Sequence, residues 1–269
     1  MITSTSNPRI RRVVQLQKQA KARREAGVFV VEGRKMCAEA PTDRVVEVYL
    51  SESYEKEHGS AKQPDRILPE RGQSCVEVVS DAVFRTISDT KTPQGILAVV
   101  KQSRVTLEQI LAAPGPAHLI VLENLQDPGN LGTILRTAEG AGVTGIILSE
   151  DTVDIYNPKV IRSTMGSLYR VPFCTVPDVK ETVRELKQRG ICCYAAALQK
   201  SMDYTEPDYR KPTAFLIGNE GNGLSEAAVA AADRAIRIPM EGRVESLNAS
   251  IAAGLLMYEV HRQRRQKQG

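Results

Sequence analysis

The feature that most constrains the fold is the regular alternation of short apolar segments with helical segments after residue 117. Six segments have the length and apolar character of buried strands: 118–122, 145–148, 173–176, 192–197, 214–217 and 235–238. The intervening pattern predicts helices over 131–140, 158–167, 179–189, 225–232 and 247–262. Such alternation requires crossover connections, which build a mostly parallel sheet covered by helices on both faces. We therefore predict an α/β domain over residues 118–269.

A second, smaller α/β unit is expected upstream of it. Residues 8–26 are typical of one basic helix opened by Asn7-Pro8, and helices are also predicted over 34–40 and 81–87. Strands are predicted over 28–31, 45–50, 75–79 and 96–100, and a polar helix plus loop over 52–66. The Pro/Gly-rich segment 112–116 is typical of a linker. A chain of 269 residues can build two cores, so we predict an N-terminal domain over 1–105 and a linker over 106–117.

The basic residues are unevenly distributed, although the formal net charge is only +4. They crowd both ends of the chain: Arg9, Arg11, Arg12, Lys18, Lys21, Arg23 and Arg24 at the start, and Arg262, Arg264, Arg265 and Lys267 at the end. A polyanionic partner and solvated helix faces explain such clusters equally well. Charge alone therefore does not decide the function.

The cysteines and histidines exclude several classes of site. The five cysteines, none in a C-x-x-C pair, are Cys37, Cys75, Cys174, Cys192 and Cys193. They predict reduced, buried thiols in a cytoplasmic protein, without a disulfide framework or zinc site. The three histidines are scattered and indicate no metal. Neither a signal peptide nor an apolar run long enough to span a membrane is found, so we expect no membrane partner.

Gly140, Gly142 and Gly145 match the dinucleotide-binding pattern G-x-G-x-x-G. In that pattern the glycines follow a strand and open a helix, so that the pyrophosphate meets the helix N-terminus. Here they follow a predicted helix and precede a predicted strand, which favours a helix C-cap and turn. This reversed order excludes a Rossmann dehydrogenase. No P-loop is present, so nucleotide hydrolysis has no support either.

Three motifs place glycine or small polar residues where a strand ends and a helix begins. They are Asn130-Leu-Gly-Thr-Ile-Leu-Arg136, then Leu216-Ile-Gly-Asn-Glu-Gly-Asn-Gly-Leu-Ser225, then Ile238-Pro-Met240 with Ser246-Leu-Asn-Ala-Ser250. Ligands of α/β proteins bind at such points. Each motif also has an ordinary explanation: Asn130, Ser246 and Asn248 as helix caps, Arg136 as a surface charge, and the glycines as a loop.

Together the three motifs resemble those of the SpoU (TrmH) branch of the SPOUT methyltransferases, over roughly residues 118–262. The resemblance implies transfer of a methyl group from S-adenosylmethionine to an RNA ribose 2′-hydroxyl, by a homodimer whose domain is tied in a trefoil knot. The apolar residues Ile251, Leu255, Leu256 and Tyr258 suit such an interface and suit a core helix equally well. By the same resemblance Gly218, Ile238 and Leu247, with their neighbours Ile217, Pro239 and Met240, contact the cofactor. The implied catalytic residues are Asn130, Arg136, Glu220, Ser246 and Asn248.

The role of Arg136 stays open at this point. Family members are thought to use this arginine near the 2′-hydroxyl, with a role as base under discussion. A guanidinium is effectively always protonated, so the alternative is that Arg136 orients the hydroxyl or binds a neighbouring phosphate through a bidentate contact. Glu220 is expected either to pair with Arg136 or to hold the ligand loop in shape.

The N-terminal segments Phe29-Val-Val-Glu-Gly-Arg-Lys35 and 88–97 resemble the small substrate-binding domain that often precedes the catalytic domain in this family. That domain is similar to RNA-binding ribosomal proteins, which implies ribosomal RNA as the partner. The candidate phosphate contacts are Arg9, Arg11, Arg12, Arg23, Arg24, Arg34 and Lys35. With no tryptophan, recognition of RNA shape is favoured over base stacking. Two alternatives remain: a transfer-RNA methyltransferase, and a non-catalytic RNA-binding protein that keeps the fold.

Overall fold

The structure, a computed structural model, describes residues 1–58 and 75–266. The chain forms two compact units: Met1–Ser103 with Asp154–Tyr169, and Arg104–Val153 with Arg170–Gly269. The units differ from the expected domain bounds in that residues 154–169, placed by sequence in the C-terminal domain, pack in the first unit. Residues 59–66 of the expected helix-plus-loop segment 52–66, and the basic residue Lys267, lie outside the described residues.

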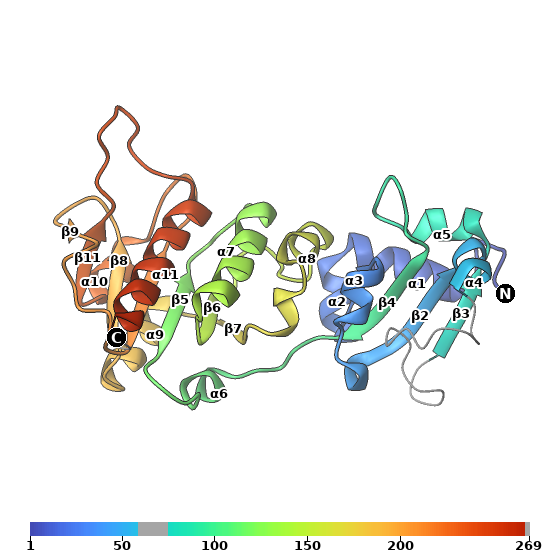
Figure 1. Cartoon of the computed structure of the whole chain (residues 1–269), viewed down its shortest axis with the longest axis horizontal. Helices are drawn as coiled ribbons and strands as arrows, with labels where there is room; N and C mark the ends of the chain where they lie inside the picture. The colour runs from blue at the N-terminus through green and yellow to red at the C-terminus, as the bar shows by residue number, and fades with distance from the viewer. Residues whose placement is uncertain (59–74, 267–269) are drawn as a thin grey trace. The chain divides into compact units, whose positions relative to one another are not determined.

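The first unit is built on a four-stranded mixed sheet (Figure 1). Its order is β1 (Val28–Glu32), β4 (Ile96–Lys101), β2 (Val45–Ser51) and β3 (Cys75–Val79). The β1–β4 and β4–β2 pairs are antiparallel, whereas β2 and β3 are parallel. All four strands predicted from the sequence are therefore present.

The N-terminal basic segment is two helices, not the single helix predicted over 8–26. They are α1 (Pro8–Lys18) and α2 (Ala20–Ala26), and Gln19 between them is extended, with φ −122° and ψ 115°. Asn7 caps α1 as expected, because its side chain accepts a hydrogen bond from the Arg9 amide. The buried face of α1 carries Ile10, Val13 and Leu16, which pack into the core of this unit. The helices α3 (Arg34–Ala38), α4 (Glu52–His58) and α5 (Asp81–Ile87) complete its main part.

Residues 154–169, with helix α8 (Pro158–Thr164), are held in the first unit by buried contacts. The guanidinium of Arg23 is only 3% exposed and donates to Asp154 Oδ2 from Nε at 2.8 Å and from Nη2 at 2.6 Å. The ring centroids of Tyr156 and Phe29 lie 4.5 Å apart, and the Tyr156 hydroxyl accepts a hydrogen bond from the Ser103 amide. Arg23 is thus part of the core, and the expectation that it contacts phosphate is wrong.

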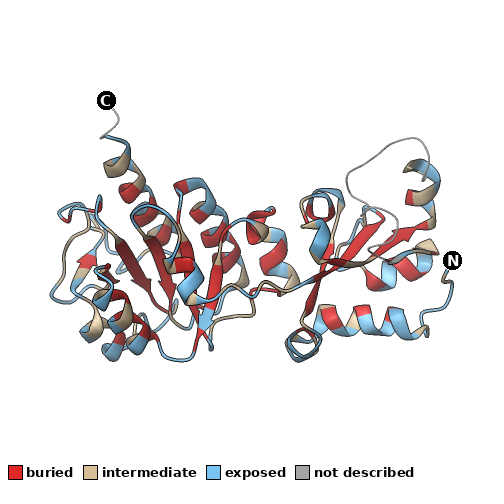
Figure 2. Cartoon of the chain, turned by 90° about the horizontal axis from the view of Figure 1, so that it is seen from below, coloured by how far each residue is buried: buried red, intermediate tan, exposed pale blue. Residues whose placement is uncertain are grey.

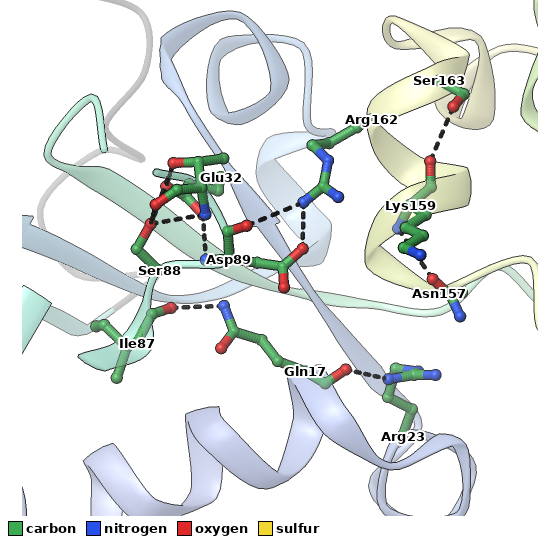
Figure 3. Close-up of polar contacts among 11 residues, drawn as sticks. Gln17, Arg23, Glu32, Ile87, Ser88, Asp89, Asn157, Lys159, Arg162 and Ser163 are labelled. Carbon is green, nitrogen blue, oxygen red and sulfur yellow. Dashed lines mark hydrogen bonds and ion pairs between the residues drawn. The ribbon is translucent and has the colours of Figure 1, made fainter. Parts of the chain in front are cut away.

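Figure 3 shows a second set of contacts in this unit, around Glu32 at the end of β1. Its carboxylate accepts hydrogen bonds from Ser88 Oγ at 2.6 Å, from the Asp89 amide at 2.9 Å and from Thr90 Oγ1 at 2.7 Å. Asp89 in turn pairs with Arg162 of α8. Glu32 therefore fixes the loop whose sequence resembles the family's substrate-binding domain.

The second unit is built on a seven-stranded sheet in which every pair is parallel. Its order is β7 (Phe173–Val176), β6 (Gly145–Ser149), β5 (His118–Leu122), β10 (Thr213–Ile217), β8 (Cys192–Ala196), β11 (Arg234–Arg237) and β9 (Met202–Asp203). The six predicted strands are present, and β9 was not predicted because two residues give no periodicity. Figure 2 shows the central strands buried along most of their length, as expected for a sheet covered on both faces.

Helices cover both faces of this sheet. On one face α9 (Val179–Gln188), α10 (Glu226–Ala231) and α6 (Leu107–Leu111) bury apolar side chains against Leu119 and Val121 of β5. The helices α7 (Pro128–Ala141) and α11 (Ala249–Arg265) pack against each other, and α11 also contacts β10 (Figure 1). Helix α6 lies within the expected linker, and its Ile110 is buried in the core.

The two ends of α7 decide two expectations. Asp127 is its N-cap and accepts a bond from the Asn130 amide at 2.7 Å, so the interpretation of Asn130 as the N-cap is wrong. Gly142 ends the helix in the left-handed conformation, with φ 72°. The glycines 140–145 are therefore a helix C-cap and turn, as predicted, and not a dinucleotide-binding loop.

The C-terminal basic cluster is partly structural. Arg264 donates to the carbonyl oxygens of Pro116, Ala117, Tyr209 and Lys211 at 2.8–3.0 Å. Arg262 pairs with Glu259 of the same helix. Arg264 thus joins α11 to the chain just before β5 and β10, and its guanidinium is engaged within the fold.

Candidate active site

The three motifs meet at one edge of the seven-stranded sheet. β5 and β10 are neighbours in parallel register, with Leu122 opposite Ile217, so the loops after them leave side by side. β11 runs in the same direction two places away, beyond β8. The carboxyl ends of all these strands face the same edge, which is where α/β proteins bind ligands.

A chain of hydrogen bonds links one residue from each motif. The carboxylate of Glu220 accepts from the amides of Asp127 at 2.9 Å and Gln126 at 3.1 Å, and from Asn130 Nδ2 at 3.1 Å. Asn248 Nδ2 donates to Asn130 Oδ1 at 2.9 Å. Asn130 is 8% exposed and stands at the centre of this chain. The structure thus brings together three of the five predicted catalytic residues.

Glu220 is held as an anion by these contacts. Partial burial acts to raise the pKa of Glu220, but the bonds from Asn130 and from the amides of Asp127 and Gln126 outweigh it and hold that pKa below its ordinary value. A carboxylate with three donors is an organising acceptor and a poor base. Of its two expected roles, shaping the ligand loop matches the geometry.

Asn248 has a second role as the N-cap of α11. Its Oδ1 accepts from the Ser250 amide at 2.9 Å and from Ser250 Oγ at 2.6 Å. With the oxygen committed to the helix, its amide nitrogen points to Asn130. The cap interpretation and the active-site interpretation are therefore both compatible with this residue. Ser246, two residues earlier, is exposed in the loop before α11.

Arg136 lies apart from this chain of hydrogen bonds. Six residues after Asn130 on α7, it is displaced by about 9 Å along the helix axis and by roughly 240° around it. Its side chain is exposed, and it makes no hydrogen bond or ion pair with any residue in 1–58 or 75–266. The expected pairing of Arg136 with Glu220 is absent from this structure.

The glycine-rich loop after β10 is shaped by its own backbone. Asn219 and Gly223 exchange two backbone hydrogen bonds at 3.0 and 2.9 Å, and Gly223 has φ 68°. A Cβ atom on Gly218 would lie 2.1 Å from the Gly223 carbonyl carbon, so only glycine fits there. Gly218 therefore has a structural reason for its identity that is independent of any ligand.

The same edge carries apolar side chains suited to a nucleoside and to the carbon chain of a methionine. Ile238, Met240 and Leu247 are half-buried in the loops after β11, whereas Pro239 is exposed and Ile217 is buried at the end of β10. Pockets for small cofactors combine apolar walls with a few backbone donors and acceptors, and strand ends supply the latter. The residues at this edge fit S-adenosylmethionine.

Residues 117–258, more than half of the chain, match the model of the SpoU rRNA methylase family. The chain belongs to this family. Residues 7–98 match the MRM3-like substrate binding domain. The resemblance found in the motifs is thus confirmed, and so is the fold class of a large parallel sheet with a separate N-terminal unit.

Similar proteins extend over nearly the whole chain. An uncharacterized tRNA/rRNA methyltransferase of Synechocystis is 36% identical, over 97% of this chain and 93% of its own. The 23S rRNA (guanosine(2553)-2′-O)-methyltransferase of Bacillus subtilis is 33% identical, over 89% of this chain and 91% of its own. A crystal structure of an S-adenosylmethionine-bound rRNA methyltransferase from Sinorhizobium meliloti has a TM-score of 0.84 and 32% identity, and the match covers 97% of both chains.

Two features of this family member's site were not predicted from its sequence. The loop after β8 faces the same edge, because β8 lies between β10 and β11, and its Leu198 is 58% exposed. Glu123, directly after β5, bonds to Ser225 at the start of α10. Strand order and contacts between distant loops leave no periodic signal in the sequence.

Two kinds of site are absent from residues 1–58 and 75–266. No group of three His, Cys, Asp or Glu side chains there is arranged to hold a metal ion. No helix among them is long and apolar enough to cross a membrane.

Proposed function

We propose that this SpoU family member transfers a methyl group from S-adenosylmethionine to the ribose 2′-hydroxyl of a guanosine in 23S ribosomal RNA. The observation that carries the proposal is the Glu220–Asn130–Asn248 hydrogen-bond chain, which links all three motifs at one sheet edge. The relative from Bacillus subtilis supports the choice of RNA, because its name specifies a guanosine of 23S rRNA. A transfer-RNA substrate is the second candidate, since the Synechocystis relative is named for both RNA classes.

In this proposal the cofactor supplies an electrophilic methyl group on a sulfonium. The loops around Gly218, Ile238 and Leu247 bind it, together with Ile217, Pro239 and Met240. Asn130 is held by Glu220 and Asn248 so that its amide lies fixed beside the cofactor loops. Ser246, in the exposed loop before α11, is the remaining residue proposed to line this site beside the cofactor. Because much of the acceleration comes from positioning the acceptor oxygen, no strong base is required.

Arg136 is proposed to act on the RNA. Its exposed guanidinium offers several donors and stays protonated, so it orients the ribose or binds the adjacent phosphate. We expect Arg136→Ala to abolish methyl transfer to ribosomal RNA while S-adenosylmethionine still binds, as measured by tritium transfer and by calorimetry. Thr133→Ala, one turn earlier on the same helix, is the control and keeps activity. Near-normal turnover of Arg136→Ala removes Arg136 from the mechanism.

The first unit is proposed to hold the RNA. Its residue range overlaps the substrate-binding domain match, and the basic side chains of Arg11, Lys18 and Arg24 are exposed on α1 and α2. Phosphate contacts of this kind weaken as salt rises, without depending on sequence. Replacing all three by glutamine should reduce RNA affinity and the salt dependence of binding, with cofactor affinity unchanged.

A homodimer is the proposed assembly. Three large apolar side chains of α11 follow one another on one helix face and are exposed: Ile251 (54%), Leu255 (39%) and Tyr258 (49%). Leu256, between them in sequence, is 1% exposed and belongs to the core. A contiguous exposed apolar row is a common mark of an interface. The trefoil knot, the cytoplasmic location and the domain bounds 1–105 and 118–269 stay with this proposal as predictions.

A further inference from the structure

Glu123 makes a contact that the three motifs do not include. It is the first residue after β5, and its carboxylate accepts from the Ser225 amide at 2.7 Å and from Ser225 Oγ at 2.8 Å. Ser225 is the N-cap of α10 and its Oγ accepts from the Ala228 amide at 3.1 Å. The glycine-rich loop of residues 218–225 is thus fastened to the end of β5 at its C-terminal end.

The same two loops are joined in the opposite direction by Glu220. Glu220 belongs to the loop after β10 and reaches the amides of Gln126 and Asp127, which belong to the loop after β5. A third contact joins the same two loops, because Asn219 Nδ2 donates to the Asn124 carbonyl at 2.9 Å. Two carboxylates and one side-chain amide therefore connect the neighbouring loops, with Glu123 and Glu220 reaching in opposite directions.

These contacts restrain a loop that is rich in glycine and would otherwise be flexible. Gly221, Asn222 and Gly223 are exposed, and glycine gains more backbone freedom than other residues when a loop is released. If such a loop is disordered before the ligand binds, part of the binding free energy is used to order it, and affinity falls. A loop that the protein already holds in place avoids this loss. Hydrogen bonds from backbone amides and hydroxyl groups to an ionised carboxylate are among the stronger hydrogen bonds in proteins, so they can hold the glycine-rich loop in one conformation.

We infer that Glu123 is a positioning residue for the methyl donor: it holds the glycine-rich loop in its binding conformation through Ser225. The inference rests on the proposed function, since it assigns S-adenosylmethionine to that loop. Glu123 touches neither reacting atom and acts through Ser225. Its removal should therefore weaken cofactor binding, with a much smaller effect on turnover once the cofactor is saturating.

The test is calorimetric titration of the full-length protein with S-adenosylmethionine and S-adenosylhomocysteine. Glu123→Ala removes both bonds to Ser225, and we expect Kd for both ligands to rise roughly tenfold, the effect of one charge-assisted hydrogen bond. KM for S-adenosylmethionine should rise equally, with kcat within about twofold of wild type. Glu123→Gln keeps one oxygen to accept the Ser225 amide, and should recover most of the lost affinity.

The control is Glu226→Ala, which removes a neighbouring exposed carboxylate that makes no hydrogen bond to the other described residues. It should bind both ligands like wild type. Unchanged ligand affinity in Glu123→Ala overturns the inference, and so does a loss of kcat at unchanged KM. If Glu123→Ala fails to fold, Ser225→Ala takes its place, because it removes the hydroxyl bonded to Glu123, and unchanged affinity for both ligands in that variant overturns the inference as well. Wild-type protein that binds neither ligand refutes the proposed function itself, a result distinct from any of these.

Discussion

Replacing Arg264 by alanine separates two explanations of the basic C-terminus. In the structure its guanidinium donates to four carbonyl oxygens, from Pro116, Ala117, Tyr209 and Lys211. It lies in the last turns of α11, and burial lowers the pKa of its guanidinium. If the role of Arg264 is to hold these carbonyls, Arg264→Ala should lower the free energy of unfolding. If Arg264 instead contacts a phosphate of the RNA, the same variant should bind RNA more weakly.

The magnitude follows from the number and type of bonds. A hydrogen bond to a charged group contributes about 1.5–3 kcal/mol net, and the carbonyls freed by Arg264→Ala regain part of this from water. We therefore expect a loss of about 2–4 kcal/mol in the free energy of unfolding of the second unit. For a unit of this size, each kcal/mol lowers Tm by about 2–4 °C. A lysine side chain cannot donate to four carbonyl oxygens at once. Arg264→Lys should therefore recover only a minor part of the free energy of unfolding that Arg264→Ala loses.

The assay is urea denaturation followed by circular dichroism, together with RNA binding at two salt concentrations. Arg265→Ala is the matched control, because Arg265 is exposed on the same helix and its side chain makes no hydrogen bond or ion pair with the other described residues. It should leave stability unchanged. An unaltered denaturation midpoint in Arg264→Ala, accompanied by weaker RNA binding, would refute the structural explanation.

Three further predictions concern other parts of the molecule. Asp154→Ala leaves the buried Arg23 without its carboxylate and should destabilise the first unit by about 3 kcal/mol in urea denaturation. Burial, with a contribution from the Arg264 charge, lowers the pKa of His118 to about 3, so the folded state binds this proton less readily than the unfolded state. Stability should therefore be insensitive to His118 above about pH 6.5 and fall as pH drops from there towards 3, a dependence that His118→Gln should remove from urea midpoints. The double change Ile251→Glu and Leu255→Glu should shift the mass measured by analytical ultracentrifugation from dimer to monomer.

Each of these predictions has a result that contradicts it. Asp154→Ala with wild-type stability would mean that the ion pair is replaceable by water. A pH dependence of stability that persists in His118→Gln belongs to other groups. A double glutamate variant of α11 that keeps the wild-type mass places the interface elsewhere. Val244→Glu, at another exposed apolar residue, is the control for that last experiment.

Several parts of the fold and site were predictable because local sequence determines them. The predicted strands 118–122 and 214–217 contain the continuous apolar runs 119–122 and 214–217, and every residue in them is buried. The C-cap at Gly142 and the cap at Asn7 follow from backbone chemistry within a few residues. Where two local signals competed, prediction failed: Asn130 suits an N-cap, but Asp127 three residues earlier occupies that position.

Apart from the two-residue β9, the strands, most helices and the three motifs were predictable from the sequence alone, because these depend on propensity and periodicity over short segments. Tertiary structure decided which segments meet. Only the placement of β10 beside β5 brings Glu220 to Asn130 and Glu123 to Ser225. Contacts between residues some 90 or more positions apart depend on strand order, which leaves no mark on local composition. The fate of a basic residue also depends on tertiary structure. Arg23 and Arg11 lie in the same basic cluster of the sequence, but in the folded chain Arg23 is buried in an ion pair with Asp154 and Arg11 is exposed.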